Sequence, residues 1–278
     1  MEIKRTETRA IDRARERMAL TSVLAFLLVT SVSCTTGTEP APQTNANENS
    51  TATNTAAQQA DTGEQAYGRA AMRLQIKYIP KRTVTGGVAF AIDAPGGPIV
   101  LTSAHIIATM GNGKKLESVS IVDGVTREPV CKTLGVVWAG KTFEGFDFSK
   151  DVTALAVEDL PESIVRLKLA TDRPAIGTRV RILGIPSDGS TTQVSIEGVV
   201  TVATSLRHEI DIDPTVKGRG LAGSPIVLEA TGQVIGIVQA VTAKQGRAFV
   251  IATPAEAILR LVPTAKPEIQ PISVWTGQ

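Results

Sequence analysis

Three short segments carry the residues whose types and order could support chemistry. His105 ends an apolar run that begins at Ile99, Asp151 opens another apolar run, and residues 220–225 form a glycine-rich hexapeptide with Ala222 in third place. A histidine can accept a proton near neutral pH, a neighbouring carboxylate can orient it, and glycines let a backbone approach a ligand closely. Each signal is weak alone, because a single histidine beside an apolar strand is more often a packed core residue. Their order along the chain is the stronger observation.

Taken together, these segments resemble those of the chymotrypsin-like serine proteases. Residues 99–105 (Ile-Val-Leu-Thr-Ser-Ala-His) resemble that family's Leu-Thr-Ala-Ala-His signature, and residues 151–157 resemble its Asp-Ile-Ala-Leu-Leu segment. Residues 220–225 (Gly-Leu-Ala-Gly-Ser-Pro) resemble its nucleophile loop, and residues 233–238 resemble the strand after that loop. Residues 174–186 are similar to a Gly-x-x-Val-x-x-x-Gly-x-Pro segment of the high-temperature-requirement and glutamyl endopeptidase groups.

The resemblance implies a role for each matching position. His105 would be the general base, Asp151 would orient its ring, and the N–H groups of Gly220 and Ala222 would form the oxyanion hole. Ala222 stands where the family has its nucleophilic serine. Alanine removes the attacking oxygen and keeps the N–H groups. Loss of that serine lowers turnover by a factor on the order of 10⁶, or about 8 kcal/mol of barrier.

Two neighbouring residues compete for these roles. Asp147 is a second carboxylate candidate, but the apolar strand that follows Asp151 favours the latter. Ser224 would become a substitute nucleophile if the loop were reframed, yet Pro225 would then follow it with a fixed φ and no N–H. We therefore expect Ser224 to pack as a small residue beside the cleft. The second histidine, His208, lies between two charged residues, and we expect it in a solvated loop.

The family's substrate-binding positions fall on apolar or neutral residues. Gln239, Ala240 and Val241 would line the cleft, and Val216 would form the floor of the specificity pocket. No acidic side chain is available there to bind Lys or Arg. We expect a peptide or protein ligand with a modest apolar side chain.

Three functions follow from these assignments. The leading expectation is a pseudoprotease that holds a peptide or protein segment by strand addition without cutting it. The second is an active serine endopeptidase whose nucleophile at position 222 was replaced by engineering, or whose role Ser224 has taken over. The third is a structural envelope protein that uses the fold as an interaction scaffold.

The first 33 residues predict export. Residues 1–17 carry six basic and four acidic side chains, and residues 18–33 carry no charge. A basic segment followed by an apolar stretch too short for a comfortable membrane span is typical of a signal peptide. Residues 1–33 are therefore predicted to be a signal peptide.

The next segment predicts a lipid-anchored tether. The run from Ser31 to Cys34 resembles a bacterial lipobox, although leucine is usual in place of Ser31, so Cys34 is the expected lipidation site. Residues 35–66 contain no Val, Ile, Leu, Met or aromatic residue, and residues 34–66 are predicted to be a disordered tether. We expect a periplasmic lipoprotein or one of the outer or cell membrane, with secretion as the alternative.

Composition narrows the classes of partner. Without residues 1–17, the totals of 29 basic and 27 acidic side chains fall to 23 of each, so a basic nucleic-acid-binding face is not expected. Cys131 is the only cysteine besides Cys34, which predicts a buried free thiol and no disulfide. The sequence shows no metal-ligand cluster and no phosphate-binding glycine loop, so neither a metal nor a cofactor is expected.

From Tyr67 onward, short β-branched runs alternate with Gly, Pro, Asp and Asn, which is typical of an all-β domain. Residues 93–97 are suited to a hairpin turn. Thr253, Pro254 and Glu256 predict the start of a terminal helix. The expected strands are residues 87–92, 99–102, 134–138, 151–157, 174–186, 194–202, 209–212, 225–228, 233–238 and 249–252.

The resemblance, which covers roughly residues 70–265, implies the chymotrypsin-like fold. That fold has two six-stranded antiparallel β-barrels and a C-terminal helix. The expected protease-like domain spans residues 67–265, and residues 266–278 form a C-terminal tail. The remaining length leaves no room for the PDZ domain that many high-temperature-requirement proteases carry.

Overall fold

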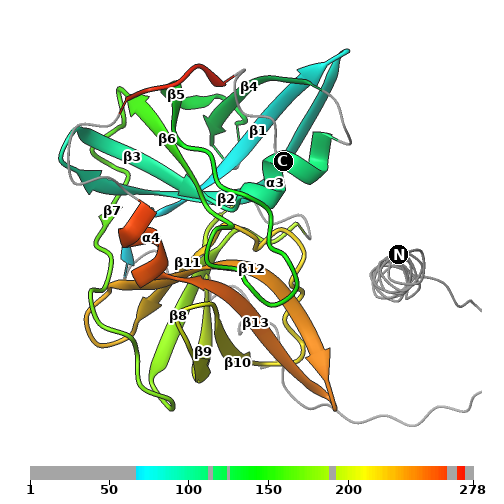
Figure 1. The fold of residues 1–278 in the computed structure, drawn as a ribbon, viewed down its shortest axis with the longest axis vertical. Coiled ribbons are helices and arrows are strands. Elements are labelled where there is room, and N and C mark those ends of the chain that lie inside the picture. The colour runs from blue at the N-terminus through cyan, green and yellow to red at the C-terminus, as the bar shows by residue number, and fades with distance from the viewer. Residues whose placement is uncertain (1–66, 112–114, 124–125, 188–191, 262–267, 273–278) are drawn as a thin grey trace, which may run out of the picture. The chain divides into compact units, whose positions relative to one another are not determined.

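The computed structural model describes residues 67–111, 115–123, 126–187, 192–261 and 268–272. Two β-barrels follow one another along the chain, and a short helix lies beside their junction (Figure 1). The expected signal peptide and tether lie outside the described residues. No helix in the described part is both long and apolar enough to cross a membrane.

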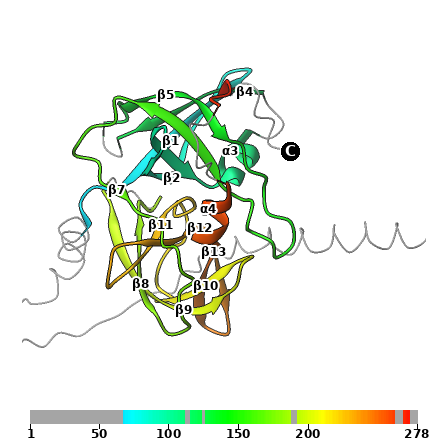
Figure 2. The same cartoon turned by 60° about the vertical axis from the view of Figure 1, so that its left-hand side comes forward.

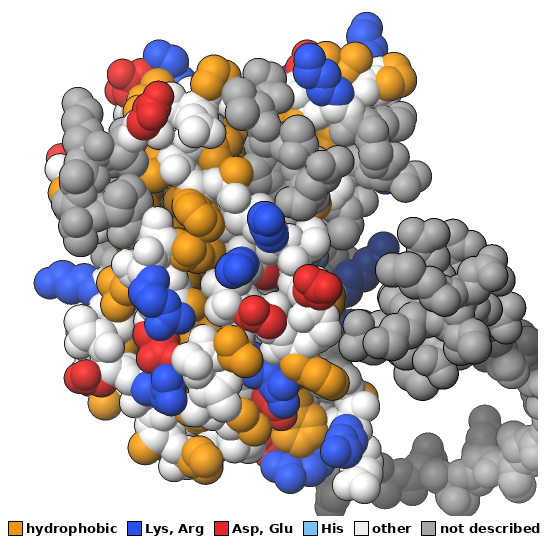
Figure 3. Space-filling model, in the orientation of Figure 1, with side chains coloured by type: hydrophobic (Ala, Val, Ile, Leu, Met, Phe, Trp, Pro, Cys, Tyr) orange, Lys and Arg blue, Asp and Glu red, His pale blue; other side chains and the backbone are white. Residues whose placement is uncertain are grey.

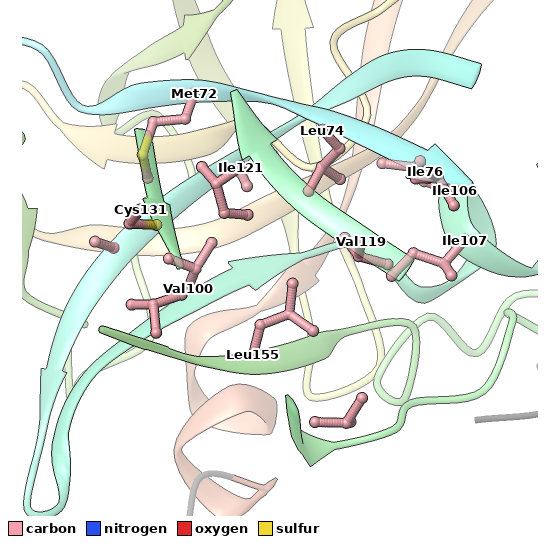
Figure 4. Close-up of a cluster of buried hydrophobic side chains, with 14 of the residues drawn as sticks. Met72, Leu74, Ile76, Val100, Ile106, Ile107, Val119, Ile121, Cys131 and Leu155 are labelled. Atoms are coloured by element: carbon pink, nitrogen blue, oxygen red, sulfur yellow. The ribbon is translucent and has the colours of Figure 1, made fainter. Parts of the chain in front are cut away.

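The first barrel has the strand order β1-β4-β5-β6-β3-β2 and is closed by pairing of β1 with β2. Its elements are β1 (Ala71–Ile79), β2 (Arg82–Ala94), β3 (Gly97–Thr102), α3 (Ala104–Gly111), β4 (Lys115–Val122), β5 (Pro129–Trp138), β6 (Thr153–Glu158) and β7 (Arg166–Leu167). All its pairings are antiparallel, and β7 adds to β2 in parallel. The β1 side chains Leu74, Ile76 and Tyr78 are buried at every second position. Figure 4 shows Leu74 and Ile76 beside Val119 of the neighbouring strand β4 and beside Ile106 and Ile107 of α3.

The second barrel is closed in the order β10-β13-β12-β11-β8-β9. Its elements are β8 (Arg179–Gly184), β9 (Val194–Ala203), β10 (His208–Ile212), β11 (Pro225–Leu228), β12 (Val234–Lys244), β13 (Arg247–Pro254) and the helix α4 (Ala255–Leu261). These pairings are all antiparallel. Two six-stranded antiparallel barrels and a C-terminal helix confirm the expected fold class.

A shared apolar cluster joins the two barrels. It combines Phe90 and Leu101 of the first barrel with Leu183 and Ile237 of the second, and Ile258 of α4 packs against them. Each such side chain contributes about 1.5–3 kcal/mol when it is withdrawn from water. Because both barrels contribute to one core, loops at their junction are held from two sides.

The structure adds elements that the sequence patterns did not predict. β1 and β4 were not among the expected strands, and the run expected at 174–186 is a strand only over β8. The hairpin is confirmed, since β2 and β3 pair down to Ala94 opposite Gly97. His105 lies in the first turn of α3.

Candidate active site

The turn that leads from β3 into α3 fixes the position of His105. Thr102 and Ser103 are fully buried there. The hydroxyl of Thr102 donates to the Val88 carbonyl at 2.7 Å, and that of Ser103 donates to the Val238 carbonyl at 3.0 Å. Val88 belongs to the first barrel and Val238 to the second. The start of α3 is therefore anchored to both barrels.

His105 and Asp151 form a close pair. Nδ1 of His105 lies 2.8 Å from Oδ2 of Asp151, and the backbone N–H of His105 donates to Oδ1 at 2.9 Å. The Asp151 side chain is fully buried, whereas 17% of the His105 side chain is exposed. An ionised carboxylate accepts a hydrogen bond from Nδ1–H, which leaves Nε2 as the acceptor nitrogen of the neutral ring. This is the orientation that a histidine base needs.

Asp151 is held from behind by residues that the sequence patterns did not single out for this purpose. Its carbonyl accepts a hydrogen bond from Nε2 of Gln239 at 2.7 Å. The same Nε2 donates to Oγ1 of Thr253 at 2.7 Å, and Thr253 Oγ1 donates to the carbonyl of Phe148 at 2.6 Å. The N–H of Asp151 also donates to that Phe148 carbonyl, at 3.1 Å. The side chain of Gln239, expected to line the cleft, is therefore buried and positions Asp151.

The loop around Ala222 is built on glycines in the left-handed region. Gly220 has φ +91° and Gly223 has φ +87°. A Cβ on Gly223 would lie 1.9 Å from the Val88 carbonyl oxygen, so no larger residue fits without displacing backbone. Leu221 is fully buried in the second-barrel core, while Ala222 packs against the first-barrel core. The carbonyl of Ala222 accepts a hydrogen bond from the N–H of Val88 at 2.8 Å.

The two N–H groups expected to form an oxyanion hole are those of Gly220 and Ala222. Within the described part of the chain, neither donates a hydrogen bond to a backbone or side-chain acceptor. The N–H between them, that of Leu221, donates to the carbonyl of Gly218 at 3.2 Å. An unpaired pair of N–H groups in a rigid loop can bind a carbonyl or carboxylate oxygen of a ligand.

The two competing residues occupy other places. Asp147 caps its own turn by accepting hydrogen bonds from the N–H and hydroxyl of Ser149, and these bonds lower the pKa of its carboxyl. Ser224 is fully buried, and its Oγ has no hydrogen-bond partner among the described residues. This hydroxyl lies toward Gly184 of β8, where a Cβ would be 3.0 Å from it. The Ser224 hydroxyl is therefore buried beside β8 and is not exposed on the surface.

The remaining residues expected to contact substrate lie together near Gly218. Val216 and Val241 are partly buried and pack against the second-barrel core. A Cβ on Gly218 would lie 2.4 Å from the Cβ of Val241, so the Val241 side chain fills the space beside this glycine. Ala240 is partly exposed on β12 and pairs with Ile251 of β13. Their role in contacting a substrate stays a prediction.

The loop between β5 and β6 carries Phe143, Phe146 and Phe148, called here the aromatic wall, and Phe143 of this group lies beside His105. The ring of Phe143 meets the imidazole edge-on with centroids 6.1 Å apart, and it stacks on Phe148 at 4.6 Å. Phe148 is buried, whereas Phe146 is 76% exposed and Arg207 lies 5.0 Å from its ring centroid. The sequence signal for this group is the spacing of two or three residues between its aromatic side chains.

The prediction for His208 is wrong. His208 lies on β10 and is 1% exposed, and neither ring nitrogen has a hydrogen-bond partner among the described residues. Burial lowers the pKa of His208 to about 4; Glu256 raises it and Arg173 lowers it by smaller amounts. Side chains alternate on a strand, so the charged neighbours of His208 point outward while the imidazole points inward.

Charges of both signs are mixed on one face of the molecule. On the face shown in Figure 3, basic and acidic side chains are interspersed with apolar ones. In the described ranges, no group of three or more His, Cys, Asp or Glu side chains is placed to hold a metal ion. Cys131 is buried, and burial raises the pKa of its thiol to about 11. The chemistry available at the site is that of the His105–Asp151 pair and the loop N–H groups.

Solved serine proteases share this architecture. The Rv3671c protease from M. tuberculosis in its active form is similar with a TM-score of 0.51 and 20% identity, over 84% of this chain and 97% of that chain. AL20, a thermostable serine protease from an extremophilic microorganism, is similar with a TM-score of 0.54 and 13% identity, over 72% of this chain and 96% of that chain. No family sequence model and no curated sequence matches the chain. With its two closed barrels and C-terminal helix, the chain has the chymotrypsin-like serine protease fold.

Proposed function

We propose that the chain is an exported pseudoprotease that binds a peptide or protein segment at the His105 site and does not cleave it. One observation carries this proposal. Two hydrogen bonds join His105 to the Asp151 carboxylate, whereas the Ala222 side chain has no hydroxyl oxygen to act as a nucleophile. A base without a nucleophile leaves binding as the activity of the site.

Strand addition is the proposed mode of binding. β12 pairs with β11 only up to Ile237, and Val238 bonds with residues 223 and 224 of the loop. From Ala240 onward the described part of β12 has β13 as its only strand partner. An extended peptide placed along this edge would add its backbone hydrogen bonds to the sheet. Its carbonyl could then reach the N–H groups of Gly220 and Ala222.

The aromatic wall supports an apolar ligand side chain. Phe143 is 42% exposed and Phe146 is 76% exposed. Leu206, which precedes Arg207 in the sequence, is 49% exposed. The N–H of Phe148 donates to the Leu206 carbonyl at 3.2 Å, so the loop and this turn are joined. Large apolar side chains that are left exposed next to a polar site are typical of binding surfaces.

Export is proposed from the sequence of the leader. A basic segment, an uncharged apolar stretch and Cys34 follow in the order that signal peptides of lipoproteins have. Cell fractionation with a Cys34→Ala variant tests this part separately. Release of the variant from the membrane fraction supports anchoring through Cys34, and unchanged fractionation contradicts it.

A peptide-capture experiment tests binding without cleavage. The full chain is immobilised and exposed to a mixture of peptides, and retained peptides are identified by mass spectrometry over time. We expect intact peptides that carry an apolar residue, with at least ten-fold weaker affinity for a Phe143→Ala variant, about 1.4 kcal/mol. Ile176→Ala is the matched control, because Ile176 is 73% exposed on the other barrel. Retained peptides that shorten with time would support the endopeptidase. If no peptide is retained, the proposal that the site binds peptides is contradicted.

A further inference from the structure

Strands β4 and β5 separate over most of their length. Their pairing is confined to Ile121 and Val122 on the β4 side. A surface hollow of about 550 Å³ opens between them, lined by residues 118–120 and 129–133 together with Asp159. Among the described residues, β6 is the only named strand that pairs with the second half of β5, so the other edge there has no strand partner. An open edge of this kind is a template for an added strand.

Residues 268–272, drawn in red in Figures 1 and 2, lie on this edge, where Gln270 forms an antiparallel bridge with Val136 of β5. The N–H of Gln270 donates to the Val136 carbonyl at 2.9 Å, and the N–H of Val136 donates to the Gln270 carbonyl at 2.8 Å. This is a hydrogen-bonded antiparallel pair. Two residues later, Ile272 packs against the core of the first barrel.

The sequence on both sides of this contact suits it. A Cβ on Gly135 would lie 2.4 Å from the Gln270 carbonyl oxygen and 2.7 Å from a methyl carbon of Ile269. Only glycine lets the two backbones approach this closely, which gives a reason for a glycine inside β5. On the segment, Pro271 has no N–H, and the backbone groups at this place point away from β5. The proline therefore removes a donor that no strand would satisfy.

We propose that the open edge of β5 is a second peptide-binding site and that its ligand is the chain's own segment 268–272. Recognition combines the backbone pairing at Val136 with an isoleucine two residues further on. Helix α4, which precedes the segment, buries Ile258 in the core shared by both barrels. The docked segment is thus a second connection from the second barrel back to the first. It acts as a clasp that is separate from the His105 site.

Binding in trans tests this proposal on the full chain. An Ile272→Asp variant places a charge against the first-barrel core and should release the segment. A fluorescent peptide of residues 267–273 is then expected to bind the variant at least ten-fold more tightly than the parent, whose edge is occupied. Adding Gly135→Val to the variant should abolish this binding. Leu259→Asp is the control, because it changes an exposed α4 side chain in the same way.

Equal binding to the parent and to the Ile272→Asp chain would overturn the proposal, and so would binding that survives Gly135→Val. If the Ile272→Asp chain does not fold, hydrogen exchange of the Val136 amide in the parent decides instead. We expect this amide to be protected at least 100-fold relative to an unpaired amide. Exchange at the unpaired rate would show that the segment does not occupy the edge. Neither experiment depends on ligand binding at the His105 site.

Discussion

Acidification from pH 7 to pH 5 should destabilise the second barrel because His208 is buried in its neutral form. The imidazole is 1% exposed, and burial lowers its pKa to about 4 from the usual 6.5. The charged groups that act on it, Glu256 and Arg173, are paired with each other at 2.6 Å, so they leave it without a partner of its own. Protonation of His208 in the folded chain is therefore unfavourable, because no partner offsets the cost of a buried charge.

The sign and size of the effect follow from proton linkage. Between pH 6.5 and pH 4, His208 binds a proton in the unfolded state but stays neutral in the folded state. Its contribution to the free energy of unfolding is therefore complete above pH 6.5 and is lost as the pH falls through this window. The full shift of about 2.5 pKa units corresponds to about 3 kcal/mol in the free energy of unfolding. At pH 5 about 2 kcal/mol of it should be gone.

Urea unfolding at pH 7, 6, 5 and 4 measures this contribution. The parent is compared with His208→Leu, which replaces the imidazole with an apolar side chain of similar volume that does not titrate. His105→Gln serves as the control, since His105 is the only other histidine. The difference in unfolding free energy between the parent and His208→Leu should change by about 2 kcal/mol from pH 7 to pH 5. Parallel pH profiles for these two chains would refute the reasoning.

Two further changes test the framework of the site. Gly223→Ala should lower the free energy of unfolding by about 2 kcal/mol or more in urea unfolding, because its φ is +87° and its new Cβ would lie 1.9 Å from a backbone oxygen. Gly232→Ala, at φ +69° with no atom near its Cβ, is the control and should cost less; equal costs would contradict the steric argument. Thr253→Val removes the hydroxyl between Gln239 and Phe148 and should cost about 1–3 kcal/mol. An unchanged midpoint of thermal unfolding for this variant would show that the chain of hydrogen bonds behind Asp151 contributes nothing to stability.

Local patterns predicted most of the second barrel. Strands such as β9 and β11 were predicted from β-branched runs between turn residues. The hairpin of β2 and β3 was predicted from its Pro-Gly-Gly turn. The period-two pattern could also have placed His208, because Ile210 and Ile212 continue its inward face along β10. Glu209 and Asp211 alternate with these residues, so the polarity of the stretch as a whole wrongly favoured a solvated loop.

Long-range contacts could not be predicted in the same way. The order of His105, Asp151 and the loop around Ala222 suggested that they meet, and the structure brings the first two together. The side chain of Gln239 is held behind Asp151 by two long-range contacts, with Asp151 itself, 88 positions earlier in the chain, and with Thr253 of β13. The clasp rests on a single bridged pair, which leaves no periodic signal in the sequence. The close approach of a second backbone at Gly135 was not predicted from the sequence.

Active-site labelling tests the central claim most directly. The full chain and its Ala222→Ser variant are treated with a fluorophosphonate probe, and the labelled residue is identified by mass spectrometry. If a sound protease framework lacks only the nucleophile, the variant is labelled at position 222 and the parent is not labelled. Labelling of the parent at Ser224, or a folded Ala222→Ser variant that remains unlabelled, would contradict that account.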